Sequence, residues 1–290
     1  MGVARLHQLA FQRSEEAVAC GALCPLTTRV EAWNGAGDQS FELRHLIGSP
    51  PRHLRSAGPK PNPFRPWDQR LEVERIGADH VVILNKYPVQ IGHMLLISRD
   101  WAPQTGWLSA GDWQAVRAVQ QDSEGLWFFN SGPRAGASQP HRHLQLLPRD
   151  PGQVLCPRER WWEKRLSSRD ADATNRLERH CSVVPLQDAS ADCLQAAYLA
   201  LCKAQGVGHP LDDVQPLKPY NLLFSHSWMA LVSRSRDECK GFSINALGFA
   251  GYLLCTDRSD RCWLDQHGPE KLLSHVLPEA DLRGTTDATG

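Results

Sequence analysis

The sequence predicts a globular chain that mixes α-helices with antiparallel β-hairpins. Segments 81–100 and 220–237 each contain an apolar strand, a polar turn and a second apolar strand followed by Ser-Arg. After Ser109 and Ser190, which can cap helices, apolar residues recur at helical spacing. The repeated hairpin suggests an internal duplication. No His-x-His follows the second hairpin, which indicates that the second half has lost its site.

Length and composition exclude several classes of protein. The 290 residues, 41% hydrophobic and 22% charged, suit one large domain or two packed halves, and they exclude disordered, collagen-like and coiled-coil chains. Because 32 basic residues balance 32 acidic ones, we expect no nucleic acid or membrane as partner. Without a secretory signal or a run of about 18 apolar residues, a cytoplasmic protein is expected. Nine dispersed cysteines, none in a C-x-x-C pair, predict buried free thiols.

The first half is predicted to contain a helix, a strand, a proline-rich connection and a hairpin. Segment 3–22 has helical periodicity and should end near Gly21, and segment 41–46 alternates like a strand. Six prolines in segment 50–66 exclude a helix and predict an extended connection. A hairpin with strands 81–85 and 93–98 comes next.

Two capped helices are predicted, one in each half. The first carries Trp113, Val116 and Val119 on one face, and Gly125 separates it from an apolar strand. The second follows Ser190 and closes at Gly206.

An arginine-rich segment separates the two halves. We expect a first half at 1–148, a connecting segment at 149–180 with a short helix around Trp161, and a second half at 181–290. The second half contains the hairpin of strands 221–224 and 229–232.

Segment 130–148 carries the chemistry. Its first part, Asn130 to Pro140, is rich in Gly, Ser and Pro, so its backbone N–H groups can approach an anion. The pattern then alternates, which places His141, His143 and Gln145 on one side of a strand and Arg142 on the other, where a structural role is expected. Three polar groups buried without partners would be costly, so we expect them to face a polar ligand.

Two histidines at i and i+2 suggest three interpretations. They could form half of a zinc site, although neither Cys156 nor His180 has diagnostic spacing as a third ligand. They could be a structural, hydrogen-bonded pair. A neutral imidazole could instead attack phosphorus and carry the transferred group as a phosphoramidate. The glycine-rich loop directly before the pair favours this third interpretation.

The string GASQPHRHLQ at 136–145 resembles the histidine triad superfamily, in the transferase branch where glutamine replaces the third histidine. More narrowly, it resembles the diadenosine tetraphosphate phosphorylases, also called ATP adenylyltransferases. Further matches occur in family order along nearly the whole chain: Pro61–Phe64, Leu84–Tyr87, Gly92-His93, Phe129-Asn130, Tyr220–Leu223 and Gly241–Gly251. The resemblance implies an α+β fold, a histidine-triad-like antiparallel sheet with flanking helices and two related halves.

The activity implied by the resemblance is a reversible two-step transfer. His143 would attack the α-phosphate of diadenosine tetraphosphate and expel ATP, and inorganic phosphate would then take the adenylyl group and leave as ADP. The implied partners are a small-molecule nucleotide and phosphate. No covalent cofactor and no protein-bound metal are expected, although Mg²⁺ on the polyphosphate is chemically sensible. Segment 1–148 would be the catalytic half, and 181–290 would complete the nucleotide site.

Site residues follow from the resemblance. His143 would be the nucleophile, with His141 and Gln145 as the other catalytic positions, and the Gln145 amide would donate to a phosphate oxygen. The implied substrate contacts are Asn85, Lys86, Asn130, Gly136, Ala137, Ser138, Gln139, Asn245 and Tyr252.

The chain departs from the family pattern in the second half and near the proline-rich connection. Ala246 and Leu247 replace small hydroxyl residues, and Thr256 replaces a common lysine, for which Lys218 or Arg234 are candidates to compensate. A family lysine near the connection has no clear match; its candidates are Arg52 and Lys60.

Other interpretations stay open at this point. Asn130 could cap a turn, Lys86 could be a solvated hairpin residue, and His93 is expected to be buried and hydrogen-bonded. A sugar-nucleotide uridylyltransferase shares His-x-His-x-Gln but characteristically has proline where this chain has Arg142. A regulatory protein that binds nucleotide without turnover is the alternative from another class.

Overall fold

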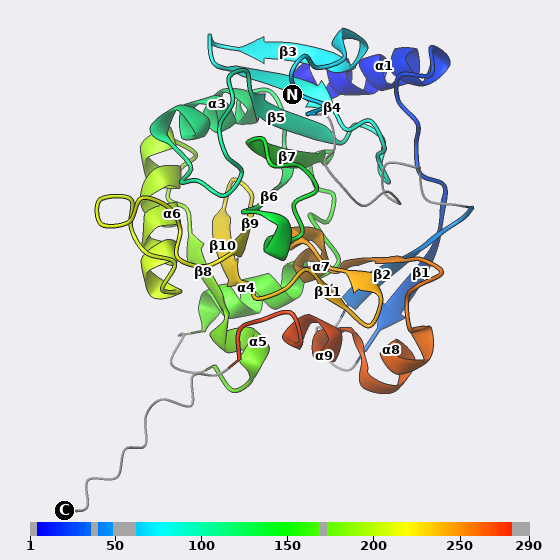
Figure 1. Cartoon of the computed structure of the whole chain (residues 1–290), viewed down its shortest axis with the longest axis vertical. Helices are drawn as coiled ribbons and strands as arrows, with labels where there is room; N and C mark the ends of the chain where they lie inside the picture. Colours follow the sequence, from blue (N-terminus) through cyan, green and yellow to red (C-terminus); the bar gives the residue numbers. More distant parts are fainter. Residues whose placement is uncertain (1–4, 36–39, 49–61, 169–172, 280–290) are drawn as a thin grey trace, which may run out of the picture.

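An eight-stranded sheet organises the fold, and every neighbouring pair of its strands is antiparallel. The computed structural model describes residues 5–35, 40–48, 62–168 and 173–279. The strand order is β3-β4-β5-β7-β6-β9-β10-β8 (Figure 1). The bounds are β3 (Glu72–Ile76), β4 (His80–Leu84), β5 (Met94–Ser98), β6 (Gly125–Asn130), β7 (His143–Pro148), β8 (Cys181–Pro185), β9 (Tyr220–Phe224) and β10 (Trp228–Ser233).

Two smaller sheets accompany the large one. In the three-stranded sheet, β2 (Ser40–Leu46) pairs with β1 (Thr28–Asn34) in antiparallel and with β13 (Tyr252–Cys255) in parallel orientation. The two-stranded sheet consists of β11 (Glu238–Cys239) and β12 (Phe242–Ser243). The parallel pairing joins the N-terminal β2 to the C-terminal β13, so the second half of the chain packs back against the beginning of the first.

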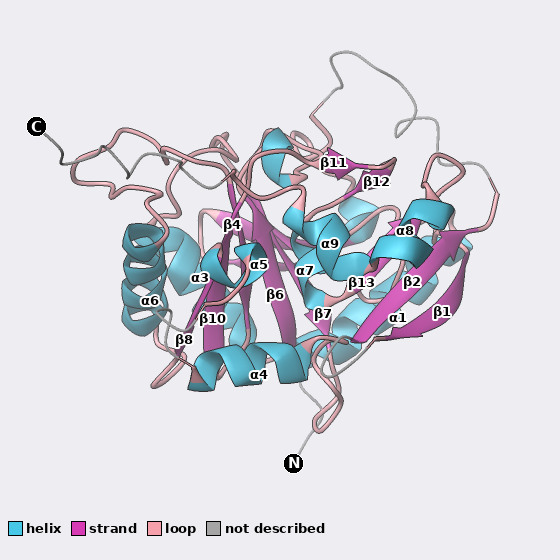
Figure 2. Cartoon of the chain, turned by 90° about the horizontal axis from the view of Figure 1, so that it is seen from below, coloured by secondary structure: helices cyan, strands magenta, loops and turns pink. Residues whose placement is uncertain are grey.

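Helices cover both faces of the large sheet. Figure 2 shows α3 (Ala110–Gln120) and α6 (Ala191–Ala204) on one side, and α7 (Ala246–Ala250) with the three-stranded sheet on the other. The remaining helices are α1 (Arg5–Ala19), α4 (Glu159–Ser167), α5 (Arg176–Arg179), α8 (Arg261–His267) and α9 (Pro269–Ser274). Alternation along β7 therefore feeds two hydrophobic cores: Leu146 belongs to the core with α3 and α6, and Leu147 to the core with α4 and α7.

Local sequence signals account for the predicted helices. Ser109 and Asp112 form a reciprocal capping box at α3, and the Ser190 side chain accepts from Cys193 N at α6. The helix α1 ends before Gly21, whose φ of 71° is in the left-handed region that favours glycine. The short helix expected around Trp161 is α4. These predictions are confirmed.

Both predicted hairpins form, as β4–β5 and β9–β10, and the α+β class with an antiparallel sheet is confirmed. The two hairpins lie in one sheet, which is continuous across the halves because Asn130 of β6 pairs with Asn221 of β9. The internal duplication and the division at 148 and 180 stay predictions.

Several elements have no counterpart in the sequence predictions: β1, β3, β8, β13, α7, α8 and α9. Strand β1, for example, is an edge strand without a single buried residue, so it lacks the alternation of apolar and polar residues on which the strand prediction depends. Most of the proline-rich connection, 49–61, lies outside the described residues, and residues 63–66 form a turn.

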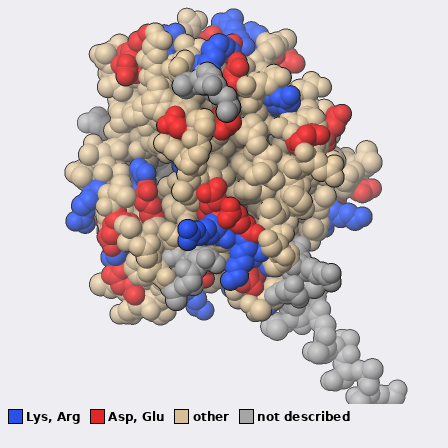
Figure 3. All heavy atoms as spheres, turned by 180° about the vertical axis from the view of Figure 1, so that it is seen from behind, with Lys and Arg blue, Asp and Glu red and all other residues tan. Residues whose placement is uncertain are grey.

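The composition led to expectations about surface charge, membrane spans and cysteine burial. Acidic and basic side chains are interspersed over the face that Figure 3 shows. Within the described ranges, no helix has the length and apolar character needed to cross a membrane. All nine cysteines are free, as predicted, but Cys20, Cys24 and Cys262 are exposed, so the expectation of burial is wrong for these three.

Leu222→Ala should destabilise the protein far more than Leu211→Ala. Leu222 of β9 is fully buried, and the cavity left by truncation should lower the free energy of unfolding by about 2–5 kcal/mol. Leu211 is 87% exposed, so its truncation should change that free energy by less than about 0.5 kcal/mol. Urea denaturation measures both; equal losses would contradict the assigned core.

Candidate active site

Strand β7 presents the motif residues on opposite faces of the sheet. His143 pairs with Ile97 and Gln145 with Leu95, on the face that α7 partly covers. Arg142 points to the other face, where its Nη1 lies 2.8 Å from the Asp112 carboxylate of α3. Arg142 is thus structural, as expected from the alternation.

The His143 imidazole is held in one tautomer. Its Nδ1–H donates to the backbone oxygen of His141 over 2.8 Å, which leaves the lone pair on Nε2. Among the residues that the structure describes, Nε2 has no hydrogen-bond partner. Burial lowers the pKa of His143 to about 4, so the ring is uncharged at neutral pH. An uncharged imidazole with a free Nε2 is the form that acts as a nucleophile.

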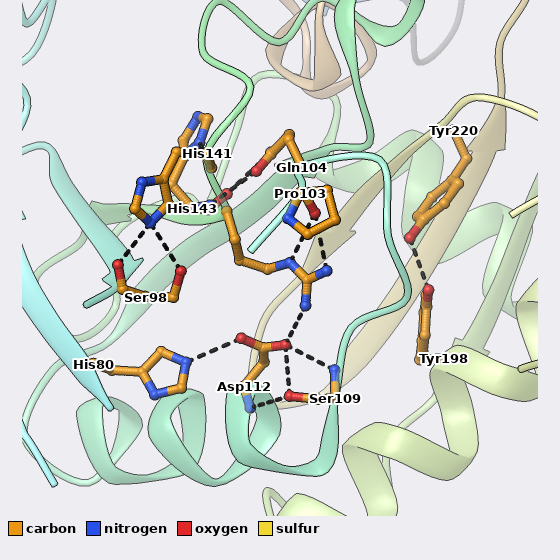
Figure 4. Close-up of polar contacts among 11 residues, drawn as sticks. His80, Ser98, Pro103, Gln104, Ser109, Asp112, His141, His143, Tyr198 and Tyr220 are labelled. Carbon is orange, nitrogen blue, oxygen red and sulfur yellow. Dashed lines mark hydrogen bonds and ion pairs between the residues drawn. The ribbon is translucent and has the colours of Figure 1, made fainter. Parts of the chain in front are cut away.

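Both ring nitrogens of His141 are already engaged. Nε2–H donates to the Ser98 carbonyl at 2.8 Å (Figure 4). Nδ1 accepts from Asn62 Nδ2 at 2.9 Å. The side chain has no exposed surface, and burial lowers its pKa. The fixed His141 thus presents its carbonyl to Nδ1–H of His143, and in this arrangement its own ring has no free nitrogen for a metal. Across the described ranges, no three His, Cys, Asp or Glu side chains are grouped so as to hold a metal ion.

A buried glutamine fixes the backbone of His143. Strands β6 and β7 pair only as far as Phe128 and Gln145, and Gln104 fills the gap where they separate. Its Oε1 accepts from His143 N at 2.8 Å (Figure 4). Its Nε2 donates to the carbonyls of Asn130 and His143 at 2.7 and 3.2 Å. Sequence reasoning missed Gln104, because it lies in a loop with no motif and acts only through tertiary contacts.

The His143 ring is more covered than the expected polar site requires. Its exposed fraction is 4%, and the centroid of the Phe64 ring lies 5.4 Å away. Phe64 also packs on the apolar cluster formed by strands β4 and β5 on this face. The sequence could not predict this cover, since Phe64 lies within the proline-rich connection, which has no periodicity to indicate where its side chains point.

Gln145, the neighbour of His143 on the same face of β7, lines a cavity of about 240 Å³. Its wall combines side chains from both halves of the chain. The lining residues are Arg44, Asn85, Tyr87, Val89, Gln90, His93, Phe128, Gln145, Leu147, Ser243, Asn245, Leu247, Tyr252, Leu253 and Leu254. Four predicted substrate or catalytic positions are therefore brought together here: Asn85, Gln145, Asn245 and Tyr252. An apolar wall with a few converging polar groups is typical of a small-molecule site.

The glycine-rich loop packs against the start of α7. Gly136 has φ of 85°, and a Cβ there would lie 2.7 Å from Asn245 Cβ and 2.8 Å from the Ile244 carbonyl oxygen. Asn245 caps α7 by accepting from Leu247 N. Only glycine allows this close approach, so the loop and the cavity wall form one unit.

The rest of the loop stays outside the cavity lining. Ala137 N–H donates to the Gly132 carbonyl. Ser138 is exposed and Gln139 half-buried, and within the described ranges their N–H groups have no backbone acceptor. Such N–H groups are available to an anion.

Two other predicted contacts also lie away from the cavity lining. Asn130 is buried, and its Oδ1 accepts from Asn221 Nδ2 and from Ala246 N, so it ties β6 to β9 and α7. Lys86 is exposed in the β4–β5 turn, with its Nζ 5.8 Å from the Tyr87 ring centroid. Their roles in substrate binding stay predictions.

The candidate compensating cations are placed differently from the expectation. Arg234 is buried and donates to Asn221 Oδ1 and to the Ile244 carbonyl, so it holds the protein together and does not face the cavity. Lys218 lines a separate hollow with Arg134. Arg52 and Lys60 lie outside the described residues.

Arg44 and His93 line the cavity without having been predicted as contacts. The Arg44 guanidinium lies 5.8 Å from the Tyr252 ring centroid, and the Tyr252 hydroxyl accepts from Arg149 at 2.8 Å. Arg44 belongs to β2, and its place in the site depends on the β2–β13 pairing, for which the sequence offers no signal. His93 is buried and hydrogen-bonded, as expected.

Lowering the pH from 6.5 to 4 should weaken the fold through His143 and His93. Burial lowers the pKa of both to about 4, below the value of about 6.5 for an unfolded histidine. In this window the unfolded chain binds more protons, so each ring lowers the free energy of unfolding by up to about 1.4 kcal/mol per pH unit, and the effect ends below pH 4. Urea denaturation at several pH values measures the slope. His143→Gln should make it shallower, and an unchanged slope would contradict the assignment.

Comparison with known proteins identifies the family. Residues 3–157 match the model of the Ap4A phosphorylase N-terminal domain, and residues 175–277 match the ATP adenylyltransferase C-terminal domain. Two relatives come from Saccharomyces cerevisiae. Diadenosine 5',5'''-P1,P4-tetraphosphate phosphorylase 2 is 27% identical over 243 residues, 73% of this chain and 74% of the relative. Protein APA1 is 25% identical over 236 residues, 72% of each chain.

Solved structures share the fold. Yeast Ap4A phosphorylase Apa2 in complex with AMP aligns with a TM-score of 0.75 at 22% identity, covering 98% of this chain and 100% of that chain. The complex of Apa2 with Ap4A aligns with a TM-score of 0.73 at 22% identity, covering 95% and 98%. The N-terminal family model alone spans more than half of the sequence, so this chain belongs to the Ap4A phosphorylase family.

Proposed function

We propose that this protein cleaves diadenosine tetraphosphate (Ap4A) with inorganic phosphate into ATP and ADP, reversibly, and that His143 carries the adenylyl group between the two steps. The observation that carries this proposal is the fixed tautomer of His143. His143 lies on the same strand face as Gln145, and Gln145 lines the cavity. Family membership supports it, since one relative is named as a phosphorylase of this dinucleotide and a solved structure is named as its complex.

In the first step, Nε2 of His143 attacks the α-phosphorus of Ap4A. The Nε2–P bond forms, the bond from phosphorus to the bridging oxygen breaks, and ATP leaves with the electron pair of that bond. The ring gains positive charge as it reacts, and the hydrogen bond from Nδ1–H to the His141 carbonyl becomes charge-assisted and stronger. The Gln145 amide donates to a non-bridging oxygen, where negative charge develops.

In the second step, an oxygen of inorganic phosphate attacks the adenylyl phosphorus. The new P–O bond forms, the P–Nε2 bond breaks, and ADP leaves while His143 returns to its neutral form. Because burial makes this imidazole weakly basic, it is a good leaving group for the onward transfer. The same low pKa keeps the ring unprotonated and ready for the next cycle.

The cavity is suited to the transferred nucleoside. Phe128, Leu147 and Leu253 provide an apolar wall for a base, and Asn245 provides polar atoms for the sugar. Arg44 is the one cation among the described lining residues. We propose that Mg²⁺ arrives as part of the substrate, bound to the polyphosphate oxygens that it prefers as ligands. All nine cysteines are free thiols, which supports the cytoplasm as the compartment.

The protein incubated with adenine-labelled Ap4A in the absence of phosphate should acquire a label that is labile in acid and stable in alkali, as a phosphoramidate is. His143→Ala should abolish the label, because His141 and His93, the other described imidazoles on this face of the sheet, have both ring nitrogens hydrogen-bonded. Labelled protein is counted after denaturing gel filtration, and a circular dichroism spectrum checks the fold. His267→Ala, at an exposed histidine, is the matched control and should keep the label. A labelled His143→Ala variant would refute the assignment.

Gln145→His should shift the product of Ap4A cleavage toward AMP. A glutamine amide donates to phosphate but cannot take a proton from water, whereas a second imidazole can act as a general base for hydrolysis. Chromatography of the nucleotides formed with and without phosphate measures the ratio of AMP to ADP. Formation of ADP and ATP alone by this variant would contradict the role given to Gln145.

A further inference from the structure

The turn between β4 and β5 carries a chain of hydrogen bonds that ends on Gln145. We propose that His93 is a positioning residue that fixes the direction of the Gln145 amide. The amide nitrogen, and not the oxygen, then faces the reacting phosphate. This inference rests on the proposed function.

The chain begins at a backbone group that can only donate. Tyr87 N–H donates to Asn85 Oδ1 over 3.2 Å. Since a backbone N–H has no acceptor capacity, this bond sets which end of the Asn85 amide is the oxygen. Asn85 N–H in turn donates to the His93 carbonyl at 2.8 Å, which closes the turn and keeps the two side chains next to each other.

The direction then passes through the His93 ring. Asn85 Nδ2 lies 3.1 Å from His93 Nδ1 and donates to it, so Nδ1 is an acceptor and the proton of the neutral ring is on Nε2. Burial lowers the pKa of His93 to about 4, which keeps the ring neutral above that pH. In this series of hydrogen bonds, each group must be a donor or an acceptor according to the assignment of the group before it.

The last bond orients the catalytic amide. His93 Nε2–H donates to Gln145 Oε1 over 3.1 Å. The oxygen of Gln145 is therefore committed to His93, and within the described residues the Gln145 amide nitrogen has no protein acceptor. Both residues line the cavity, and the His93 ring packs 5.6 Å from the Phe128 ring, which limits its rotation.

The orientation matters because a glutamine amide has two nearly isosteric ends. With the nitrogen toward the phosphate, Gln145 stabilises the negative charge that develops on a non-bridging oxygen. With the oxygen toward the phosphate, its lone pairs would repel the same charge. Without the bond from His93, the side chain would populate both directions, and only one of them supports transfer.

The test is a double-mutant cycle on phosphorolysis of Ap4A. His93→Phe removes both side-chain hydrogen bonds and keeps a ring beside Phe128. It should lower kcat about 10- to 100-fold, approaching the loss caused by removing an anion-stabilising donor, with KM changed less than about twofold. Gln145→Leu should lower kcat at least as much. The double variant should be no slower than Gln145→Leu alone, because the two residues act through one amide.

Two further variants separate positioning from support of the fold. His93→Gln, whose amide can donate to Gln145, should recover part of kcat. Met94→Ala, at the next residue but buried in the opposite core, should lower the midpoint of thermal unfolding and leave kcat unchanged. Three results would each overturn the proposal. The first is a kcat loss in the double variant equal to the product of the two single losses. The others are an unchanged kcat in His93→Phe, or a kcat loss in Met94→Ala equal to that in His93→Phe.

A measurement independent of activity reads the hydrogen-bond chain itself. Long-range ¹H–¹⁵N spectra should show the His93 ring with its proton on Nε2, and Asn85→Leu should produce a mixture of tautomers. A proton on Nδ1 in the unmodified protein would overturn the proposal. If the unmodified protein fails to phosphorolyse Ap4A, the proposed function is refuted, whereas normal turnover with multiplying losses refutes only the role of His93.

Discussion

The hydrogen bond from His143 Nδ1–H to the His141 carbonyl is the interaction on which the site depends. It fixes which nitrogen of the imidazole keeps its lone pair, and it connects two motif positions that are only two residues apart. That carbonyl is held in turn, because both nitrogens of the His141 ring are bound, to Ser98 and to Asn62. The sequence left a hydrogen-bonded histidine pair and a nucleophile as separate interpretations, but the observed hydrogen bonds are compatible with both at once.

Burial is the main cause of the low histidine pKa values in the site. The described cavity wall contains one arginine and no carboxylate, so the low pKa values of His93 and His143 come mainly from desolvation rather than from a neighbouring charge. Phe64 contributes to this by packing on the His143 ring. The same packing that makes the ring uncharged also restricts the approach to it, which distinguishes this site from an open, polar groove.

Sequence patterns predicted the features that depend on local spacing. The period of two along β7 placed His143 and Gln145 on one face and Arg142 on the other, and the caps at Ser109 and Ser190 located two helices. Features created by distant pairing were not predictable. Arg44 enters the cavity wall because β2 pairs with β13, and Gln104 reaches His143 from a loop without any periodicity. The resemblance supplied the second-half residues Asn245 and Tyr252, which no spacing rule would have selected.

The contact between Gly136 and the residues before α7 couples the glycine-rich loop to the cavity wall. More than a hundred residues separate these segments in the chain, yet no methyl group would fit between them. A shift of the loop therefore displaces Asn245 in the cavity wall, and a ligand that moves Asn245 displaces the loop. If the loop binds the phosphate chain and Asn245 the nucleoside, as proposed above, the two parts of the substrate are sensed jointly, and a molecule offering only one of them meets a surface shaped for both.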